Sequence, residues 1–533
     1  MSRTCGEALM RLLEAYGVTT VFGIPGEHSL ELYRGIQAGG LRAITPRNEQ
    51  GASLMADGYA RASGKPGVCI LAGGSGVTNA VTGIGQANAD SIPMLVISSA
   101  CQGPSPRRPW ERRSENLDLC EITRPITALS ETVLDPEELP GLIAQAIDIF
   151  RTQRPRPVHI AIPPELLEER VSEDWQATPG RGRPDPAAFE ISAAADLLAG
   201  AASTLIIAGG GAQDAAAEIT ALAERLNAGV VMTGAGKGVV SDRSPLSLGG
   251  GMASPIVQQY LAKLEVLLAI GTELTEFQYF ASGLHFDGQL VRIDIDPAHI
   301  REPLPASIEV LGDARSACQQ LLATLDGREI VTSTQDAVAG LIAVRSRQSL
   351  DYSELENRHI TLLNALRSLL ADDAMLFGDK TQLVYTGTSA MKTFLPRSWF
   401  FPASFGTIGC ALPGAIGGKV AFADRQTVAL VGDGGFMFTV NELATAVEEE
   451  LCIPIIVWDN HAFASIRDGM LRRGFDAIGV SPHAPDFTQL ASAFGCPGTR
   501  ARSLTDFQQA VRGALAHRGP SLIIVEETDD WLQ

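Results

Sequence analysis

The sequence is short of positive charge, and this shortage excludes several kinds of partner. Lysine and arginine total 42 against 61 aspartates and glutamates, which gives a formal net charge of −19 over 533 residues. No long run of Lys or Arg offers the basic surface that nucleic acids or anionic membranes attract. We therefore expect no nucleic-acid partner and small molecules as the ligands.

Paired cysteines and long apolar runs are missing as well. The eight cysteines stand singly, with no CxxC pair, which favours buried thiols in a reducing compartment over a disulfide frame or a zinc site. No apolar segment is long enough to span a bilayer. The first residues, MSRTCGEALMRLLEAYGV, lack the basic start and apolar block of a signal peptide. We expect a cytoplasmic protein without a membrane anchor.

The sequence is rich in a repeated unit of short apolar strand, glycine-rich turn and amphipathic helix. Such units form parallel sheets that helices cover on both faces. Twelve strand ends follow this pattern, among them TTVFGIPG, STLIIAGGG, QTVALVGDGG and IPIIVWDN. The prediction is an α/β fold with three doubly wound parallel sheets.

Stretches rich in proline, glycine and charge mark the expected domain boundaries. The segment VSEDWQATPGRGRPDPAAFE reads as a linker, and a second polar stretch lies near residues 326–353. The predicted domains are residues 1–170, 191–330 and 350–533, with a linker at 171–190.

The middle domain carries a glycine-rich turn, GGGAQDA, that resembles a dinucleotide-binding turn only in part. Gly209 and Gly211 fit the first two glycines of GxGxxG, but Asp214 stands in place of the third. A structural turn is the favoured interpretation, and a nicotinamide oxidoreductase is kept as an alternative class.

The stretch LVGDGGF places an acid, Asp433, in a strand-to-helix turn of the kind that usually meets a phosphate. A carboxylate can lie beside phosphates if a divalent cation lies between them. Mg²⁺ takes one or two oxygen ligands from the protein and the rest from phosphates and water. Asn460 follows the next apolar strand, so the carboxyl ends of two parallel strands would bring Asp433 and Asn460 to one cavity.

This pattern resembles the diphosphate-binding motif of thiamine diphosphate (ThDP) enzymes. The resemblance implies that Asp433, Asn460 and the backbone carbonyl of Ala462 hold Mg²⁺ against the diphosphate. It also implies a pyrimidine-binding first domain, a Rossmann-like middle domain and a diphosphate-binding third domain. The residues that it assigns to cofactor binding are Gly406, Thr407, Ile408, Gly432, Asp433, Gly434, Gly435, Asn460, Ala462 and Phe463.

The first domain supplies the second part of the resemblance. RNEQGASLMADGYAR is similar to the family's HEQGA-type motif and puts Glu49 at its glutamate. The resemblance implies that Glu49 promotes the pyrimidine's imino tautomer by proton exchange, which helps to remove the thiazolium C2 proton. Ile408 would support the bent cofactor from below. The loop LAGGSGVTNA (residues 71–80) matches the family's glycine-rich turn.

Assembly follows from the same resemblance. In this family the cofactor lies between the first domain of one subunit and the third domain of another, so a homodimer is the minimum unit and a homotetramer is expected. Some acetolactate synthases also carry FAD in the middle domain, and the sequence leaves this open.

The implied reaction is the non-oxidative decarboxylation of a 2-oxo acid to an aldehyde and CO₂. His28, in GIPGEHSLELYRG, matches a proton-shuttling histidine of benzaldehyde-lyase-like enzymes, and imidazole suits this task near neutral pH. The same stretch, together with DKTQLVYTG (residues 379–387) and the later GVSPHAPDF, looks most like bacterial 5-guanidino-2-oxopentanoate decarboxylases. A guanidinium group pairs best with a carboxylate, and the candidates are Glu27, Asp379 and Asp468.

Three departures from the family pattern leave the substrate open. Asn48 replaces a histidine before Glu49, GGSG replaces GPG at residues 73–76, and Asp459 replaces the first asparagine of an Asn-Asn pair. The alternatives are an acetolactate synthase-like or benzaldehyde lyase-like carboligase or lyase, and a catalytically silent relative.

Overall fold

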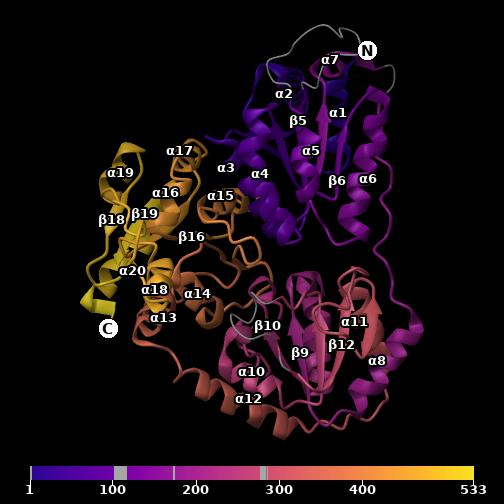
Figure 1. The fold of residues 1–533 in the computed structure, drawn as a ribbon, viewed down its shortest axis with the longest axis vertical. Coiled ribbons are helices and arrows are strands. Elements are labelled where there is room, and N and C mark those ends of the chain that lie inside the picture. The colour runs from indigo at the N-terminus through magenta and orange to yellow at the C-terminus, as the bar shows by residue number, and fades with distance from the viewer. Residues whose placement is uncertain (1–2, 101–116, 172–173, 276–283, 285, 533) are drawn as a thin grey trace.

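The computed structural model describes residues 3–100, 117–171, 174–275, 284 and 286–532, which form three parallel sheets flanked by helices (Figure 1). We call residues 3–171 the first unit, residues 188–348 the middle unit and residues 354–532 the third unit. The predicted α/β class with three doubly wound parallel sheets is confirmed.

The first unit has a six-stranded sheet in the order β3-β2-β4-β5-β7-β6. Its strands are β2 (Thr20–Gly23), β3 (Arg42–Ile44), β4 (Gly67–Leu71), β5 (Met94–Ser99), β6 (Leu129–Thr132) and β7 (Val158–Ile162). Its helices are α1 (Cys5–Ala15), η1 (Glu27–Ser29), α2 (Leu30–Ala38), α3 (Glu49–Ser63), α4 (Ser75–Ala89), α5 (Leu119–Thr123), η2 (Arg124–Ile126), η3 (Pro136–Glu138), α6 (Leu139–Thr152) and α7 (Pro164–Leu167). A short antiparallel pair, β1 (Arg3–Thr4) with β8 (Arg170–Val171), joins its two ends.

The middle unit has a five-stranded sheet in the order β10-β9-β11-β12-β13. Its strands are β9 (Thr204–Ala208), β10 (Gly229–Met232), β11 (Val266–Ile270), β12 (Gln289–Asp294) and β13 (Ile308–Leu311). Its helices are α8 (Ala188–Gly200), η4 (Gly210–Ala215), α9 (Ala216–Leu226), η5 (Gly234–Gly236), η6 (Gly251–Ala253), α10 (Pro255–Leu261), α11 (Ala314–Leu325) and α12 (Thr334–Gln348). The polar stretch near residues 326–353 is therefore largely helical, and its α12 lies against α10.

The third unit has a six-stranded sheet in the order β15-β14-β16-β17-β19-β18. Its strands are β14 (Met375–Gly378), β15 (Trp399–Phe400), β16 (Thr427–Gly432), β17 (Ile453–Asp459), β18 (Gly498–Arg500) and β19 (Pro520–Glu526). Its helices are α13 (Glu354–Arg367), α14 (Gln382–Ala390), α15 (Ala411–Ala421), α16 (Asp433–Phe438), α17 (Glu442–Glu448), α18 (Ala464–Arg472), α19 (Phe487–Ala493), α20 (Leu504–Ala516) and η8 (Asp530–Leu532).

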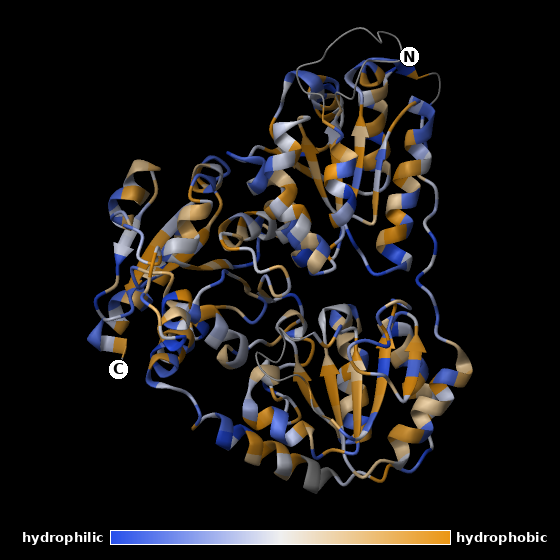
Figure 2. Ribbon diagram, in the orientation of Figure 1, coloured by the Kyte–Doolittle hydropathy of each residue, from blue (hydrophilic) through white to orange (hydrophobic). Residues whose placement is uncertain are grey.

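Apolar strands build the cores of all three units. The central strands appear as orange arrows between mixed-colour helices (Figure 2), as expected for parallel sheets buried on both faces. The middle unit has a core of its own. The first and third units share one core across α3 and α15, where Gly58 and Gly417 let the two backbones approach so closely that a Cβ atom would collide.

The structure bears on two expectations from the sequence, one about membrane spans and one about cysteines. In the part of the chain that the structure describes, no helix combines the length and apolar character needed to cross a membrane. The seven described cysteines are all free thiols, and most are buried. Cys101 lies outside the described residues.

Candidate active site

Asp433 and Asn460 lie at the same edge of the third sheet. β16 ends at Gly432 and β17 ends at Asp459, and Gly432 pairs with Trp458 in a parallel register. Asp433 is the first residue of α16, and Asn460 immediately follows β17. The carboxyl ends of neighbouring parallel strands therefore bring an acid and an amide together, as the sequence predicts.

Burial makes the Asp433 carboxylate costly. Only 4% of the residue is exposed. Its pKa is raised to about 6, first by burial and then by the nearby Asp459 carboxylate, against the opposing hydrogen bond from the backbone N–H of Gly434. A buried, incompletely compensated carboxylate at the mouth of a strand suits a cation ligand.

Two residues that the sequence did not single out fix the orientation of Asn460. Its Nδ2 donates to Glu527 Oε2 at 3.3 Å and to Gln382 Oε1 at 3.5 Å. Its Oδ1 accepts from the backbone N–H of Ala462 at 3.3 Å. Because an ionised Glu527 carboxylate can only accept, it faces the amide nitrogen of Asn460, and the amide oxygen points to the opposite side. Gln382 and Glu527 lie in separate segments that meet Asn460 only at the sheet edge, so only the fold reveals their role.

The glycines of the Asp433 turn leave no room for side chains. A Cβ atom on Gly434 would lie 2.5 Å from the ring of Phe463. One on Gly435 would lie 3.1 Å from the Asp379 carboxylate, and one on Gly432 would lie 3.1 Å from Thr381 Oγ1. The turn at residues 432–435, which we call the cradle, therefore needs glycines because neighbouring protein atoms already fill the space that side chains would take.

The segment between β15 and α15 carries Gly406, Thr407 and Ile408 to the same region. Gly406 has a φ of +78°, a left-handed conformation that favours glycine. A Cβ atom on Gly435 would lie 3.4 Å from Ile408 Cγ1, so Ile408 borders the cradle. Among the described residues, the buried Thr407 Oγ1 has no hydrogen-bond partner. A bound group that reaches Thr407 would satisfy this oxygen.

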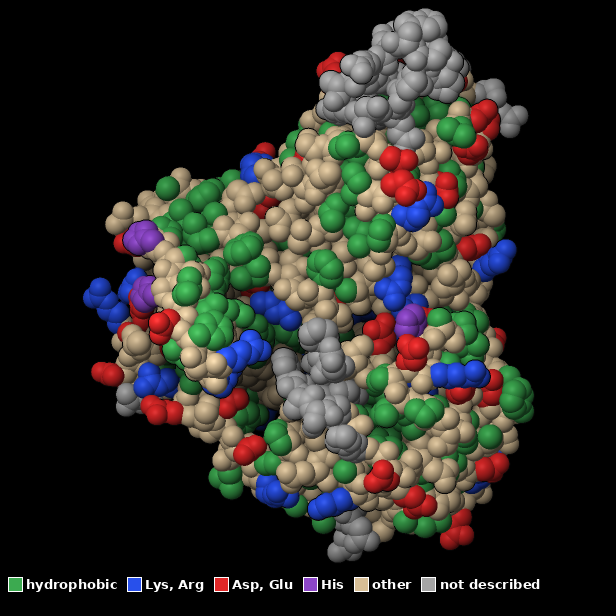
Figure 3. All heavy atoms as spheres, in the orientation of Figure 1, with side chains coloured by type: hydrophobic (Ala, Val, Ile, Leu, Met, Phe, Trp, Pro, Cys, Tyr) green, Lys and Arg blue, Asp and Glu red, His purple; other side chains and the backbone are tan. Residues whose placement is uncertain are grey.

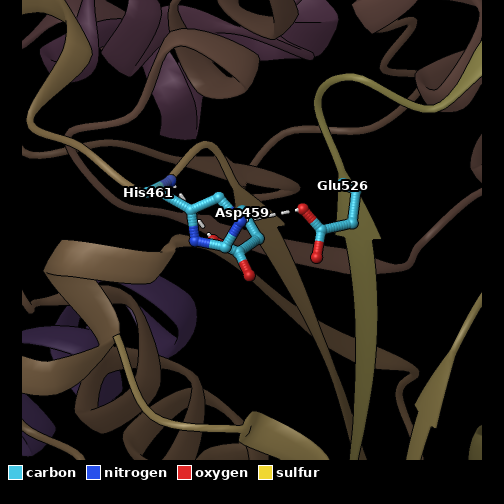
Figure 4. Close-up of side chains that lie close together, drawn as sticks. All are labelled: Asp459, His461 and Glu526. Carbon is cyan, nitrogen blue, oxygen red and sulfur yellow. Dashed lines mark hydrogen bonds and ion pairs between the residues drawn. The ribbon is translucent and has the colours of Figure 1, made fainter. Parts of the chain in front are cut away.

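Asp459, the unexpected acid beside Asn460, belongs to a charge network (Figure 4). His461 Nδ1 lies 3.3 Å from Asp459 Oδ1, and its Nε2 lies 3.1 Å from Glu526 Oε2. Glu526 also forms an ion pair with Arg500. The donor atoms of Asp459, His461 and Glu526 lie within 4.8 Å of one another, and contacts with His461 and Arg500 already engage both acids. We interpret this network as a set of contacts that stabilises the turn after β17.

Glu49 begins α3 in the first unit. Asn48 is the N-cap residue, and its side chain accepts from the backbone N–H of Gln50 at 2.8 Å. This cap is a physical reason for asparagine where relatives carry histidine. Glu49 Oε2 accepts from Asn79 Nδ2 at 3.0 Å, so the loop at residues 71–80 and the glutamate meet. In the GGSG stretch, Gly74 has a φ of +61° immediately before α4.

His28 and the three carboxylate candidates lie in different settings. His28 is half-buried in η1, and Glu27 next to it is exposed. Asp379 is 1% exposed, and both of its oxygens accept from the backbone N–H of Gly409 at 2.9 Å. Burial raises the pKa of Asp379 to about 6, and these backbone hydrogen bonds oppose the rise. Asp468 on α18 forms an ion pair with Arg467.

The two halves of the predicted site are not joined within one chain. Among the described residues, no hydrogen bond or ion pair links Glu49 to Asp433 or Asn460. The same chain nevertheless ties the start of α3 to its own third unit, because Glu442 on α17 accepts from the backbone N–H groups of Arg47 and Asn48. The first and third units are thus docked while the candidate site stays divided.

A separate cavity of about 270 Å³ lies at the carboxyl edge of the middle sheet, where the three units meet. Arg154 of the first unit reaches it and pairs with Glu273, Asp294 and Asp296 at 2.7 to 3.0 Å. Figure 3 shows acidic, basic and histidine side chains gathered at the boundary of the first and middle units.

The middle unit's glycine-rich turn lines this cavity. A Cβ atom on Gly209 would collide with the backbone of Gly271, so glycine at position 209 allows the two strand ends to approach closely. Asp214 pairs with Arg183 and Arg397. These contacts agree with the structural-turn interpretation.

The chain has three parallel sheets. An acid and an amide lie at the edge of the third sheet, and a glutamate lies at a glycine-rich turn of the first. This combination defines a cofactor-dependent α/β enzyme of multidomain type. Three models of the thiamine pyrophosphate enzyme family match the chain: the N-terminal TPP-binding domain over residues 3–110, the central domain over residues 191–321 and the C-terminal TPP-binding domain over residues 382–525. The chain belongs to this family, and the predicted resemblance is confirmed.

Relatives similar to the chain carry two kinds of name. The probable 2-ketoarginine decarboxylase AruI of Pseudomonas aeruginosa is 42% identical over 98% of this chain and 93% of its own length. A probable acetolactate synthase large subunit of Methanocaldococcus jannaschii is 31% identical over 97% of this chain and 90% of its own length. The acetolactate synthase isozyme 1 large subunit of Escherichia coli is 30% identical over 98% and 93%.

Proposed function

We propose that the protein is a Mg²⁺- and ThDP-dependent enzyme that decarboxylates a 2-oxo acid to an aldehyde and CO₂, with 5-guanidino-2-oxopentanoate, also called 2-ketoarginine, as the substrate. The observation that carries this proposal is the buried Asp433 beside Asn460, in a chain 42% identical over 98% of its length to a probable 2-ketoarginine decarboxylase.

The residues at the edge of the third sheet fit the cofactor and the metal. Asp433, Asn460 and the carbonyl of Ala462 offer the hard oxygen ligands that Mg²⁺ prefers. The glycines of the cradle at residues 432–435 pack closely against Thr381, Phe463 and Asp379, and the backbone of this turn would face the diphosphate. Gly406, Thr407 and Ile408 would contact the rest of the cofactor, and the unpartnered Thr407 Oγ1 fits that role.

Two side chains of the first unit, Glu49 and His28, would handle protons in the reaction. When bound, ThDP supplies the nucleophilic carbon and the electron sink for decarboxylation. Glu49, held by Asn79, would exchange a proton with the pyrimidine ring of the bound cofactor. His28, next to the exposed Glu27 in η1, is the proposed proton shuttle to the reacting carbon.

The three carboxylates proposed for the guanidinium are not equally free. Asp379 is buried and saturated by backbone N–H groups, and Asp468 is paired with Arg467. Among the described residues, Glu27 has no hydrogen bond or ion pair, and it neighbours His28. We therefore place Glu27 first as the guanidinium partner.

Product analysis tests the reaction and the substrate separately. The purified protein with Mg²⁺ and ThDP is incubated with 2-ketoarginine, pyruvate and other 2-oxo acids. Aldehyde and CO₂ support decarboxylation, and a higher kcat/KM for 2-ketoarginine than for pyruvate supports the substrate. An acetohydroxy acid as the main product would favour the second candidate, acetolactate synthesis, which the relatives of that name support.

The change Glu49→Gln tests the cofactor assignment. The amide cannot exchange the proton that the pyrimidine ring requires, so kcat should fall by about 10²-fold or more while ThDP still binds. Calorimetric titration with ThDP and steady-state kinetics measure the two effects. The change Glu27→Gln is the companion, because it should raise KM for 2-ketoarginine and leave pyruvate turnover unaltered. Unchanged activity of Glu49→Gln would overturn the assignment.

Assembly and location are part of the proposal. We propose a homodimer as the minimum unit, with a homotetramer in solution, because Glu49 and Asp433 are not joined within one chain. A cytoplasmic location is supported by the free, mostly buried cysteines.

A further inference from the structure

Side chains of the first unit hold the segment on which Thr407 and Ile408 stand. The backbone N–H of Ser404 donates to Asp90 Oδ1 at 2.9 Å, and the backbone N–H of Thr407 donates to Gln86 Oε1 at 3.2 Å. Gln86 is in the last turn of α4, and Asp90 is its C-cap residue. The third unit's cofactor segment is therefore fixed from outside its own sheet.

A buried chain of polar contacts fixes Gln86 in turn. Gln86 is 1% exposed, and its Nε2 donates to Asp90 Oδ2 at 2.6 Å. Arg61 donates to Asp90 at 2.8 Å and to Asp57 at 2.5 Å. An ionised carboxylate only accepts hydrogen bonds, so Asp90 holds the nitrogen of Gln86 and turns its oxygen toward Thr407. A fully partnered buried network of this kind is rigid.

The same helix reaches the other half of the proposed site. Near its N-terminal end, Asn79 donates to Glu49 at 3.0 Å, and a Cβ atom on Gly76 would lie 3.5 Å from Glu49 Oε1. α4 therefore contacts the glutamate of the first unit at one end and the cofactor segment of the third unit at the other.

We propose that Gln86 is a positioning residue for ThDP: with its amide oriented by Asp90, it holds the backbone of residues 404–408 in the conformation that receives the cofactor. This inference rests on the proposed function. Gln86 contacts no reacting atom, and its effect passes through the backbone N–H of Thr407. A merely structural role would alter stability without altering the affinity for ThDP.

Two substitutions at Gln86 test the proposal by calorimetric titration with ThDP at saturating Mg²⁺. Gln86→Met fills the space but cannot accept from Thr407, so the affinity for ThDP should fall roughly tenfold, the effect expected of one lost buried hydrogen bond. Gln86→Glu keeps an acceptor but places a second carboxyl beside Asp90. Two adjacent carboxyls cannot both ionise easily, so the new glutamate has a raised pKa.

The pH profile of Gln86→Glu is the decisive measurement. At about pH 6 the protonated side chain can donate to Asp90 and accept from Thr407, as glutamine does; at about pH 8.5 the ionised pair repels. The groups that face this position are Asp57, Asp90, Arg61, Lys380 and Cys410. The affinity of Gln86→Glu relative to wild type should therefore fall as pH rises, whereas that of Gln86→Met should not change.

Asp214→Asn is the matched control, because it removes the ion pairs to Arg397 and Arg183 near the same junction without touching residues 404–408. Its affinity for ThDP should stay within about twofold of wild type. Wild-type affinity in Gln86→Met, or a Gln86→Glu profile parallel to wild type, would overturn the proposal. Wild-type protein that fails to bind ThDP would instead overturn the proposed function, and this inference with it.

Discussion

At the scale of single residues, the candidate site is built from groups that cost stability. Asp433 is 4% exposed, and burial raises its pKa from 3.8 to about 6. Because the folded-state pKa lies above the ordinary value, ionisation opposes folding at pH above about 6, and this cost disappears as pH falls toward 3.8. The residue is thus placed for a cation rather than for the stability of the free protein.

Replacing Asp433 by asparagine should therefore stabilise the protein without cofactor. The gain is at most about 3 kcal/mol near pH 7.5, from about 1.4 kcal/mol per pKa unit, and should vanish near pH 4. The same change should abolish the rise in Tm that Mg²⁺ and ThDP cause. Thermal unfolding with and without cofactor measures both.

The exposed Asp372, paired with Arg243, is the control for this change. Its pKa is lowered by the hydrogen bonds from Arg243, so Asp372→Asn should bring no gain. A variant Asp433→Asn less stable than wild type at pH about 7.5 would contradict the reasoning from burial.

At the scale of elements, the turn between β17 and α18 is set by the neighbouring strand. Glu527, directly after β19, accepts from Trp458 Nε1 at 3.0 Å and from Asn460 Nδ2 at 3.3 Å through the same oxygen. One side chain therefore links two strand ends and orients the proposed metal ligand, as partners of metal ligands commonly do.

Two substitutions at Glu527 should distinguish the effect of its side-chain shape on Mg²⁺ affinity from the effect of its hydrogen bonds. Glu527→Met leaves Trp458 and Asn460 without this acceptor, and the affinity for Mg²⁺ should fall about 10- to 100-fold. Glu527→Gln keeps one oxygen that can accept both bonds, so its affinity should stay within a few fold. Titration with Mg²⁺ at saturating ThDP measures both variants. Equal affinities of the two would show that the hydrogen bonds are not needed.

At the scale of the whole molecule, the first and third units pack together within one chain, but their proposed catalytic groups are not joined there among the described residues. The first and third units of one chain share a core through α3 and α15. Their proposed catalytic groups, Glu49 and Asp433, have no contact that joins them among the described residues. A second copy of the chain is the source that we propose for the missing half of each site.

Mixing two inactive variants tests this arrangement. If each site takes Glu49 from one subunit and Asp433 from the other, a heterodimer of Glu49→Gln with Asp433→Asn has one intact site and one doubly altered site. Random exchange of subunits should then restore about a quarter of wild-type activity. Each variant alone serves as the control, and the mass in solution gives the oligomeric state. No recovery after verified exchange would place both groups in one chain.

Much of the fold could be predicted because apolar strands and glycine-rich turns are local signals. All twelve expected strands lie where the sequence places them. The pattern misses seven described strands: β3, β6, β13, β15 and β18 are short and lie at sheet edges, and β1 and β8 form a two-residue pair of their own. An edge strand is stabilised by pairing with one neighbour, so a short sequence carries little sign of it.

The sequence by itself determined the three-sheet architecture, the family and the edge of the sheet where Asp433 and Asn460 meet, because these follow from patterns within a few dozen residues. Only the tertiary structure decided what surrounds them. Gln86 and Glu527 act from elements far away in the chain, and such contacts form only when the sheets pack.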